Sequence, residues 1–215
     1  MRAVVVAAAG QVDHSLCPHM NKADLLVAAD GGAAAMLELG FVPHAVVGDF
    51  DSLSPEVASR LAECGSEFVR VQREKDETDT ELAVRYALQH GADDITFLGA
   101  VGGRIDHTLA NLILLAGLAK KNIPVKAVTP TLAVYAVTER LVIRGTKGEL
   151  VSVFPFQGPA EGVTETGFKY PLTDAYLDPF AVVGISNELA GPEGVIQVKK
   201  GVLLVFHYHH DQKPG

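Results

Sequence analysis

The chain has 215 residues, of which 48% are hydrophobic and 20% charged, a balance typical of a globular protein with a sizeable core. Its formal net charge of −8 argues against general nucleic-acid binding, which needs a basic surface. The longest strongly apolar stretch, Leu109–Ala119, is too short to span a bilayer, so we expect no membrane anchor. Met1–Gly10 fits a buried first strand better than a signal peptide, so we expect a cytoplasmic protein in which Cys17 and Cys64 are free thiols.

The first part of the chain, up to about residue 128, alternates short β-branched runs with longer helical patterns. In the last of these patterns, Leu109, Leu112 and Ala116 recur at helical spacing. Strands that alternate with helices predict a parallel sheet with right-handed crossovers. The predicted strands are Ala3–Ala8, Leu25–Ala28, Ala45–Val47, Glu67–Val71, Ile95–Leu98 and Val125–Val128, and the predicted helices are Ala33–Leu39, Pro55–Cys64, Thr78–His90 and Thr108–Lys121.

The second part, from about residue 132, lacks the helical pattern and is rich in glycine and proline. Leu141–Ile143 and Leu150–Phe154 flank one glycine-containing turn, and Val195–Lys199 and Val202–Tyr208 flank another. Each pair predicts a β-hairpin. We therefore expect a small antiparallel domain, a sandwich or an open barrel, that begins within Thr129–Thr138.

Acidic residues come directly after successive predicted strands of the first part. Because the carboxyl ends of parallel strands share one edge of a sheet, where ligands bind, these side chains are expected to meet there. Carboxylates gathered in one crevice repel one another unless a cation neutralises them, and hard oxygen ligands near phosphate favour Mg²⁺. The residues are Asp30 after the second strand, Asp49 and Asp51 after the third, and Asp76 and Asp79 after the fourth; the segment Gly102–His107 follows the fifth strand.

These acidic residues also have ordinary structural interpretations. In an extended segment Asp49 and Asp51 point to one side and Phe50 to the other, but a surface turn explains the pair equally well. The segment Thr78–Glu81 matches a capping box, in which Asp79 would serve only the first turn of a helix.

The glycine pairs and Arg104 likewise allow two interpretations. Gly31-Gly32 and Gly102-Gly103 are either tight turns or places where the backbone approaches phosphate ahead of a helix N-terminus. Arg104 either binds phosphate or pairs with Asp106, and Asp106 can also be the N-cap of a helix that begins near Thr108. The first strand lacks the G-x-G-x-x-G pattern, which argues against dinucleotide binding.

Taken in chain order, these motifs resemble the thiamine pyrophosphokinase family. Tyr170 stands where animal and yeast members have tryptophan, and tyrosine can still stack on a cationic ring. The matching segments cover nearly the whole chain: Asp30–Gly32, Gly48–Ser52, Lys75–Asp79, Gly102–Thr108, Thr166–Leu172 and Ser186–Glu188.

The resemblance implies a Rossmann-like, ATP-binding α/β domain over residues 1–130 and a thiamine-binding β-sandwich domain over residues 131–215. It implies transfer of the diphosphate of ATP to the hydroxyl of thiamine, which gives thiamine diphosphate and AMP, with Mg²⁺ as the cofactor. It also implies a homodimer whose active site lies between the first domain of one chain and the second domain of its partner.

The resemblance further implies roles for individual residues. Asp51 and Asp79 are the two candidates for the general base, and the sequence does not choose between them. Lys169 would reach phosphate only across the dimer. The implied metal ligands are Asp49, Asp51 and Asp79, with Asp76 as a further candidate; Arg104 and Asp106 complete the catalytic set; the nucleotide contacts are Asp30, Gly31, Gly32, Asp76, Thr78, Gly103 and Arg104; and the thiamine contacts are Tyr170, Ser186, Asn187 and Glu188.

Two competing functions remain open. A related fold could transfer diphosphate to a hydroxymethyl-pterin, which would not need Tyr170 and Ser186–Glu188. A thiamine sensor without catalysis is the second alternative, although the joint presence of the acidic residues and Arg104 argues against it. In the C-terminal segment, alternation along a strand places His207 and His209 on one face and His210 on the other, and this pattern alone predicts no metal site.

Overall fold

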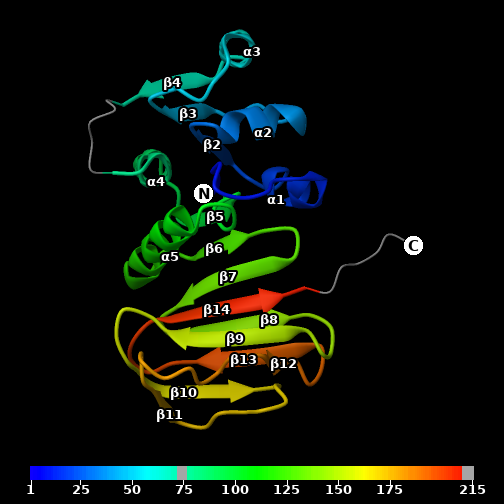
Figure 1. The fold of residues 1–215 in the computed structure, drawn as a ribbon, viewed down its shortest axis with the longest axis vertical. Helices are drawn as coiled ribbons and strands as arrows, with labels where there is room; N and C mark the ends of the chain where they lie inside the picture. The colour runs from blue at the N-terminus through cyan, green and yellow to red at the C-terminus, as the bar shows by residue number, and fades with distance from the viewer. Residues whose placement is uncertain (72–76, 210–215) are drawn as a thin grey trace. The chain divides into compact units, whose positions relative to one another are not determined.

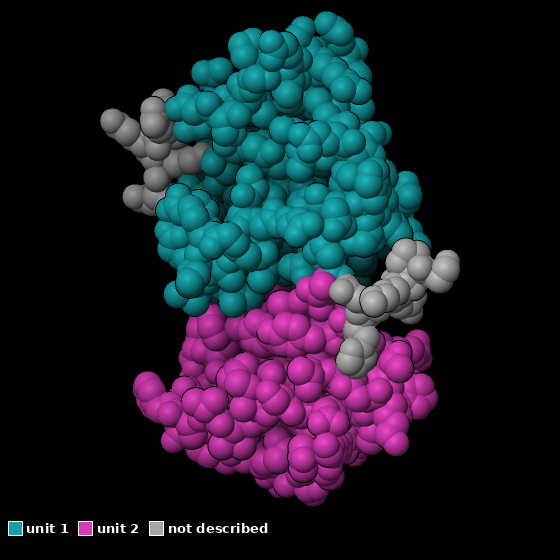
Figure 2. Space-filling model, turned by 45° about the vertical axis from the view of Figure 1, so that its right-hand side comes forward, with its two compact units in different colours: residues 1–114, 123–130 teal, residues 115–122, 131–215 magenta. Residues whose placement is uncertain are grey.

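The structure is a computed structural model that describes residues 1–71 and 77–209, so Asp76 and His210 lie outside the described residues (Figure 1). The chain divides into two compact units. Unit 1 comprises residues 1–114 and 123–130, and unit 2 comprises residues 115–122 and 131–215 (Figure 2). Each unit has its own cluster of buried apolar side chains. Among the described helices, none combines the length and the apolar character needed to cross a membrane.

Unit 1 is built on a parallel sheet with the strand order β6-β5-β1-β2-β3-β4 (Figure 1). β2 is buried throughout and β1 nearly so, as expected for parallel strands that are covered on both faces. The chain builds outward from β1 through β2, β3 and β4 and then returns to the other side of β1 with β5, which makes a topological switch point at β1. The strands are β1 Arg2–Val6, β2 Leu25–Ala29, β3 Ala45–Gly48, β4 Glu67–Arg70, β5 Asp94–Leu98 and β6 Val125–Val128; the helices are α1 Cys17–Met20, α2 Gly32–Glu38, α3 Pro55–Glu63, α4 Asp79–Gln89 and α5 Ile105–Lys120, with a short 3₁₀ turn at His14–Leu16. The residues of α5 from Leu115 onward belong to unit 2.

The predicted elements of unit 1 are present, and their ends shift by up to three residues. Thr78 caps α4 as predicted, because its side-chain oxygen accepts a hydrogen bond from the backbone N–H of Glu81 at 3.2 Å. The N-cap role for Asp106 is wrong: α5 begins at Ile105, so Asp106 lies inside its first turn. The short helical segment before β2 has no sequence periodicity to predict it. Both cysteines are free, as expected.

Unit 2 is an antiparallel sandwich. One sheet has the order β12-β9-β14-β7 and the other β11-β10-β13-β8. Val153 and Val205 of the first sheet and Val163 and Ile196 of the second belong to one buried cluster. The α/β fold with a second, antiparallel part is therefore confirmed. The strands are β7 Leu132–Val137, β8 Arg140–Arg144, β9 Leu150–Pro155, β10 Ala160–Thr166, β11 Ala175–Leu177, β12 Asn187–Glu188, β13 Glu193–Gln197 and β14 Leu203–Tyr208.

Both predicted hairpins are wrong. β8 pairs with β13 and β9 pairs with β14, so the chain passes from one sheet to the other at each glycine-containing turn instead of folding back on itself. The physical reason is burial: Ile143 of β8 and Val151 of β9 both face the common core, which they can do only from opposite layers. A short turn that contains glycine permits either connection, and strand alternation does not distinguish them.

Candidate active site

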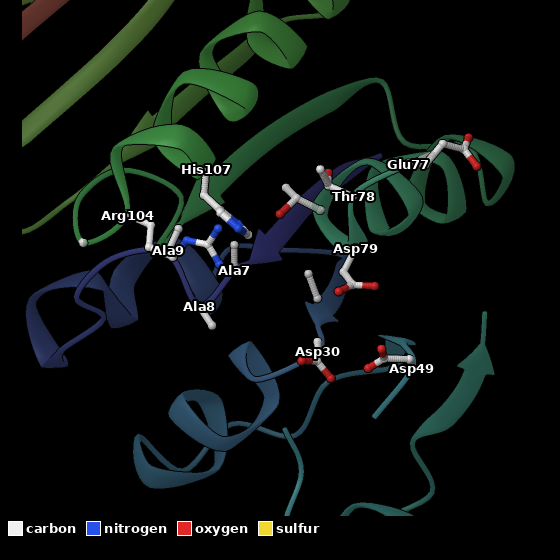
Figure 3. A pocket seen from close by; sticks show the side chains of 13 residues that line it. Ala7, Ala8, Ala9, Asp30, Asp49, Glu77, Thr78, Asp79, Arg104 and His107 are labelled. Atoms are coloured by element: carbon white, nitrogen blue, oxygen red, sulfur yellow. The ribbon is translucent and has the colours of Figure 1, made fainter. Parts of the chain in front are cut away.

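A cleft of about 620 Å³ lies at the carboxyl edge of the unit 1 sheet, beside the switch point at β1 (Figure 3). Loops and helix starts that are distant in sequence meet here because the parallel crossovers bring every strand end to the same edge. The lining residues are Ala7, Ala8 and Ala9 after β1, Ala29 and Asp30 at the end of β2, Asp49 after β3, Glu77, Thr78, Asp79 and Thr80 at the start of α4, and Gly103, Arg104 and His107 after β5.

The carboxyl groups of Asp30, Asp49 and Asp79 lie on the same side of the cleft (Figure 3). Asp30 adopts a left-handed backbone conformation with φ of 44°, and its N–H donates to the carbonyl of Val47 at 2.9 Å. One carboxyl oxygen of Asp30, Oδ1, is buried and has no hydrogen-bond partner among the described residues. Because an unpartnered buried polar atom is costly, this oxygen is a candidate contact for a ligand or cation.

The loop after β3 turns sharply at Phe50, whose φ is 67°. The Phe50 ring packs edge-on against Phe68, with ring centroids 5.4 Å apart. Asp49 then accepts a hydrogen bond from the backbone N–H of Asp51 at 3.1 Å. The extended arrangement of Asp49 and Asp51 is therefore wrong, because the chain turns at Phe50 and packs its partly buried ring against Phe68. In the part of the chain that the structure describes, Asp49 lines the cleft and Asp51 does not.

The first turn of α4 supplies Thr78 and Asp79 to the cleft. Asp79 is the first residue of α4, where the helix dipole favours a negative charge, and its carboxylate points into the cleft (Figure 3). Glu77 also lines the cleft, but its carboxylate is engaged by Arg85 at 2.5 and 3.2 Å. A capping role and a ligand-binding role are thus compatible for Thr78 and Asp79.

Arg104 and His107 lie across the cleft from the carboxylates (Figure 3). Asp106 holds the Arg104 guanidinium through two hydrogen bonds, of 2.6 and 3.2 Å. The hydrogen bond from Arg104, followed by that from the backbone of His107, lowers the pKa of Asp106 to about 2, and Asp106 raises the pKa of Arg104. Of the described residues in this loop, Gly103, Arg104 and His107 line the cleft and Asp106 does not. Its observed contacts orient Arg104.

Two glycines allow backbone segments at this edge of the sheet to pack closely against each other. Gly103 has φ of 53°, and a Cβ there would overlap the carbonyl of Ala9, so the loops after β1 and β5 pack backbone against backbone. A Cβ on Gly32 would overlap the carbonyl of Val6, so this glycine lets the start of α2 approach the end of β1. Gly31 and Gly32 do not appear among the residues that line the cleft.

In unit 2, the side chain of Asn187 connects Tyr170 and Glu188, which the family resemblance implies as thiamine contacts. Asn187 is only 5% exposed. Its Oδ1 accepts from the backbone N–H groups of Tyr170 (3.0 Å) and Glu188 (2.9 Å), and its Nδ2 donates to the Tyr170 carbonyl (2.8 Å). Nδ2 also donates to Glu165 at 2.9 Å. The motifs in the sequence do not point to Glu165, a buried carboxyl whose pKa is raised by burial. The available signal is its inward position two residues after Val163 on β10.

The Tyr170 side chain is exposed beside this network. The Lys169 ammonium lies 5.4 Å from the centre of the Tyr170 ring and 2.9 Å from the Glu188 carboxylate, so Glu188 already has a cationic partner. Ser186 has φ of 55°, and its N–H donates to the hydroxyl of Ser152 at 3.0 Å. The structure thus brings Tyr170, Ser186, Asn187 and Glu188 together in unit 2.

A Rossmann-like unit with an acidic cleft at its switch point, followed by a β-sandwich, defines a class of two-part α/β enzymes. Residues 4–127 match the sequence model described as "Thiamin pyrophosphokinase, catalytic domain", and residues 138–203 match "Thiamin pyrophosphokinase, vitamin B1 binding domain". The chain belongs to the thiamine pyrophosphokinase family, whose members are transferases.

Individual relatives are similar over nearly their whole length. The thiamine pyrophosphokinase of Bacillus subtilis (strain 168) is 31% identical over 193 residues, which cover 89% of this chain and 90% of that protein. A crystal structure of the Bacillus subtilis protein superimposes with a TM-score of 0.87 at 28% identity, covering 98% of this chain and 100% of the other. The thiamin pyrophosphokinase of Geobacillus thermodenitrificans gives a TM-score of 0.82 at 27% identity, with 99% of each chain covered.

Proposed function

We propose that this chain transfers the terminal diphosphate of ATP to the hydroxyl of thiamine, giving thiamine diphosphate and AMP. The observation that carries the proposal is the meeting of three aspartates, Asp30, Asp49 and Asp79, with Arg104 in one cleft at the switch point of the sheet. Family membership supplies thiamine as the acceptor. Transfer of a diphosphate group needs charges that neutralise and hold its oxygens. In the cleft, the carboxylates would hold a cation and the Arg104 guanidinium would hold phosphate.

The donor set of the cleft fits Mg²⁺, which prefers oxygen ligands and takes one or two carboxylates together with substrate oxygens. Asp49 and Asp79 would hold the ion, and the buried Oδ1 of Asp30, which has no hydrogen-bond partner within residues 1–71 and 77–209, offers another oxygen on the same side. Asp51, on the turn after β3, stays a prediction as a third ligand. When bound, Mg²⁺ would neutralise the charge that develops on the phosphate oxygens.

The residues of the chain have separate tasks in this proposal. Arg104, oriented by Asp106, binds phosphate, and the side-chain-free Gly103 lets the nucleotide approach the backbone. The thiamine hydroxyl attacks the β-phosphorus, and the bond from this phosphorus to the AMP oxygen breaks. A carboxylate oxygen of Asp79 takes the hydroxyl proton, since Asp79 lines the cleft and the alternative base, Asp51, does not.

Thiamine recognition falls to unit 2. The exposed ring of Tyr170 would stack on the cationic thiazolium. The Asn187 amide already makes two hydrogen bonds as acceptor and two as donor, which uses its full capacity. Asn187 therefore positions Tyr170 and Glu188, and Ser186 is the better candidate for a direct hydrogen bond to the aminopyrimidine.

We further propose that the enzyme is a homodimer whose sites combine unit 1 of one chain with unit 2 of its partner. In unit 1, Ile105, Leu109 and Ile113 recur every four residues on α5 and are 84%, 50% and 46% exposed. In unit 2, Phe180 and Val182 are 96% and 72% exposed. Exposed apolar surface of this kind typically marks a protein interface.

The reaction is tested by ³¹P NMR of the full chain with Mg-ATP, with and without thiamine. Thiamine-dependent formation of AMP and thiamine diphosphate, without ADP, is the expected result. ADP with thiamine monophosphate would contradict attack at the β-phosphorus. Thiamine binding without turnover would favour a sensor, and the absence of both would direct the assay to hydroxymethyl-pterin acceptors.

The shared site is tested by mixing two variants, Asp79→Asn and Tyr170→Ala, after partial unfolding and refolding together. If the sites are shared, half of the dimers carry one intact site, so activity at low thiamine should recover to about a quarter of that of the unmodified protein. A mixture of Asp79→Asn with Asp49→Asn, both in unit 1, is the control and should recover nothing. Equal behaviour of the two mixtures would rule out the shared site.

A further inference from the structure

A cluster of three metal-ligating side chains, Glu149, His207 and His209, lies in unit 2 and shares no residue with the cleft. We refer to it as the Glu-His-His cluster. Glu149 is 5% and His207 1% exposed, and His209 is half-buried. The His207 Nε2 and the Glu149 Oε2 are 2.7 Å apart, and one potential ligand atom from each of the three residues lies within 4.8 Å of the others.

The position of the cluster follows from strand pairing. β14 lies beside β9 with His207 opposite Val151, so Glu149, two residues before Val151, reaches His207 diagonally. His207 and His209 share a face because strand side chains alternate, and their ring centres are 4.4 Å apart. The backbone N–H of His209 donates to the Thr131 carbonyl at 2.9 Å, which fixes the chain at this point. His207 thus lies within β14, and Glu149 and His209 directly adjoin the paired strands β9 and β14.

Gly145, which has no side chain, leaves space beside the cluster for the Glu149 carboxylate. A Cβ on Gly145 would overlap the carboxylate oxygen of Glu149 and lie 3.1 Å from the His207 Nε2. A carboxylate is rarely buried without a cationic or metal partner, because its desolvation is costly.

We propose that Glu149, His207 and His209 form a binding site for a divalent cation of the Zn²⁺ class. Two imidazoles and one carboxylate are a recurrent protein ligand set for zinc, with a fourth position left for water. Tetrahedral coordination at Zn–N distances of about 2.0–2.1 Å places ligand atoms about 3.4 Å apart. The His207 and Glu149 atoms are 2.7 Å apart and all three ligand atoms lie within 4.8 Å of one another, so they already gather on the scale of a tetrahedral site.

The cluster differs in chemistry from the acidic cleft. Imidazole nitrogen suits Zn²⁺ and related transition metals, whereas Mg²⁺ prefers sites made of oxygen. The cation takes the place of the direct contact between His207 and Glu149, and it links the start of β9 to the end of β14. Because only the folded chain holds the three ligands together, bound zinc raises the stability of the fold.

The test uses the full chain without a polyhistidine tag, stripped with a chelator and then kept in excess Mg²⁺ so that the acidic cleft does not compete. Zinc binding is measured by calorimetry, and its effect on stability by thermal unfolding. We expect one Zn²⁺ per chain and a higher unfolding temperature. His209→Asn should weaken zinc binding at least tenfold and remove the stabilisation, while His90→Asn, an exposed histidine of unit 1, should change neither.

A measurement on the unmodified chain covers the case in which variants of the buried Glu149 or His207 do not fold. Cobalt(II) added to the stripped protein should give the intense visible absorption of a four-coordinate site, and one equivalent of Zn²⁺ should remove it. No zinc binding in excess Mg²⁺, an unchanged affinity in His209→Asn, or a six-coordinate cobalt spectrum would each overturn the proposal.

Discussion

The cleft of unit 1 and the Asn187 network of unit 2 hold their polar groups in opposite ways. The cleft carries charged groups such as Arg104 at the ends of strands and helices, where solvent reaches them and local contacts orient them. In unit 2, Asn187 and Glu165 are 5% and 1% exposed and depend on each other for hydrogen bonds.

This difference separates function from stability. Exposed ion pairs contribute little to folding, so the cleft can be altered without unfolding unit 1. Buried polar groups that lose a partner destabilise the fold, so any change in the Asn187 network should affect both folding and binding.

Asp79→Asn should reduce kcat by roughly 100-fold or more, because it removes a charge that binds the cation and accepts the proton. The fold should remain intact, since asparagine also suits the first turn of a helix. Steady-state kinetics and circular dichroism measure the two effects. Asp94→Asn is the matched control, because Asp94 lies at the amino end of β5, the opposite edge of the same sheet. Near-normal turnover in both Asp79→Asn and Asp49→Asn would refute the assignment of the metal site.

Asn187→Ala should lower the free energy of unfolding by about 2–4 kcal/mol, because it leaves Glu165 and two backbone groups of Tyr170 without partners in a buried site. The KM for thiamine should rise as Tyr170 loses its support. Denaturant unfolding and the thiamine dependence of turnover measure these effects. Tyr170→Phe is the control and should leave stability unchanged. If Asn187→Ala raised KM without a loss of stability, the contrast between the two regions would fail.

The sequence predicted the arrangement of unit 1 better than that of unit 2. In unit 1, strands that alternate with helices run parallel and end at one edge of the sheet, and the structure places Asp30, Asp49 and Asp79 at that edge as predicted. In unit 2, an antiparallel strand can pair with the next strand or leave it for the other sheet, and β8 pairs with β13, 49 residues on for Arg144 and Glu193. The two hairpins were wrong because a turn does not reveal which sheet the next strand joins.

Details of the candidate site were predictable only in part. The turn at Asp49–Asp51 depends on the packing of Phe50 against Phe68, which is a tertiary contact. Glutamate usually lies on the protein surface. Only the folded sandwich shows that the carboxyl groups of Glu165 and Glu149 are buried. Burial of a charged residue breaks the usual relation between polarity and exposure, so composition alone does not predict it.

Glu165→Gln should make stability less dependent on pH. Because burial raises the pKa of Glu165 above its ordinary value of 4.5, the folded protein keeps a proton that the unfolded chain has lost, and stability falls as pH rises through that interval. Glutamine does not ionise and keeps an oxygen for Asn187. The difference in unfolding free energy between the variant and the unmodified protein should therefore grow in favour of the variant from pH 4 to pH 8.

Denaturant titrations at several pH values measure this difference. Glu161→Gln, at an exposed position of the same strand, is the control and should show a much smaller pH-dependent change. A pH-independent difference for Glu165→Gln would show that the buried carboxyl does not carry the penalty.

The smallest expected effect concerns unit 1 away from its cleft. The hydroxyl of Ser54 caps α3 by accepting a hydrogen bond from the backbone N–H of Val57 at 3.3 Å. Ser54→Ala should cost about 1 kcal/mol of stability, because it removes the cap, and kcat should not change. Ser59→Ala, an exposed position inside the same helix, should alter stability by less than about 0.5 kcal/mol. A loss of turnover in Ser54→Ala would mean that the cleft depends on distant folding contacts after all, since α3 contributes no residue to the cleft lining within the described part of the chain.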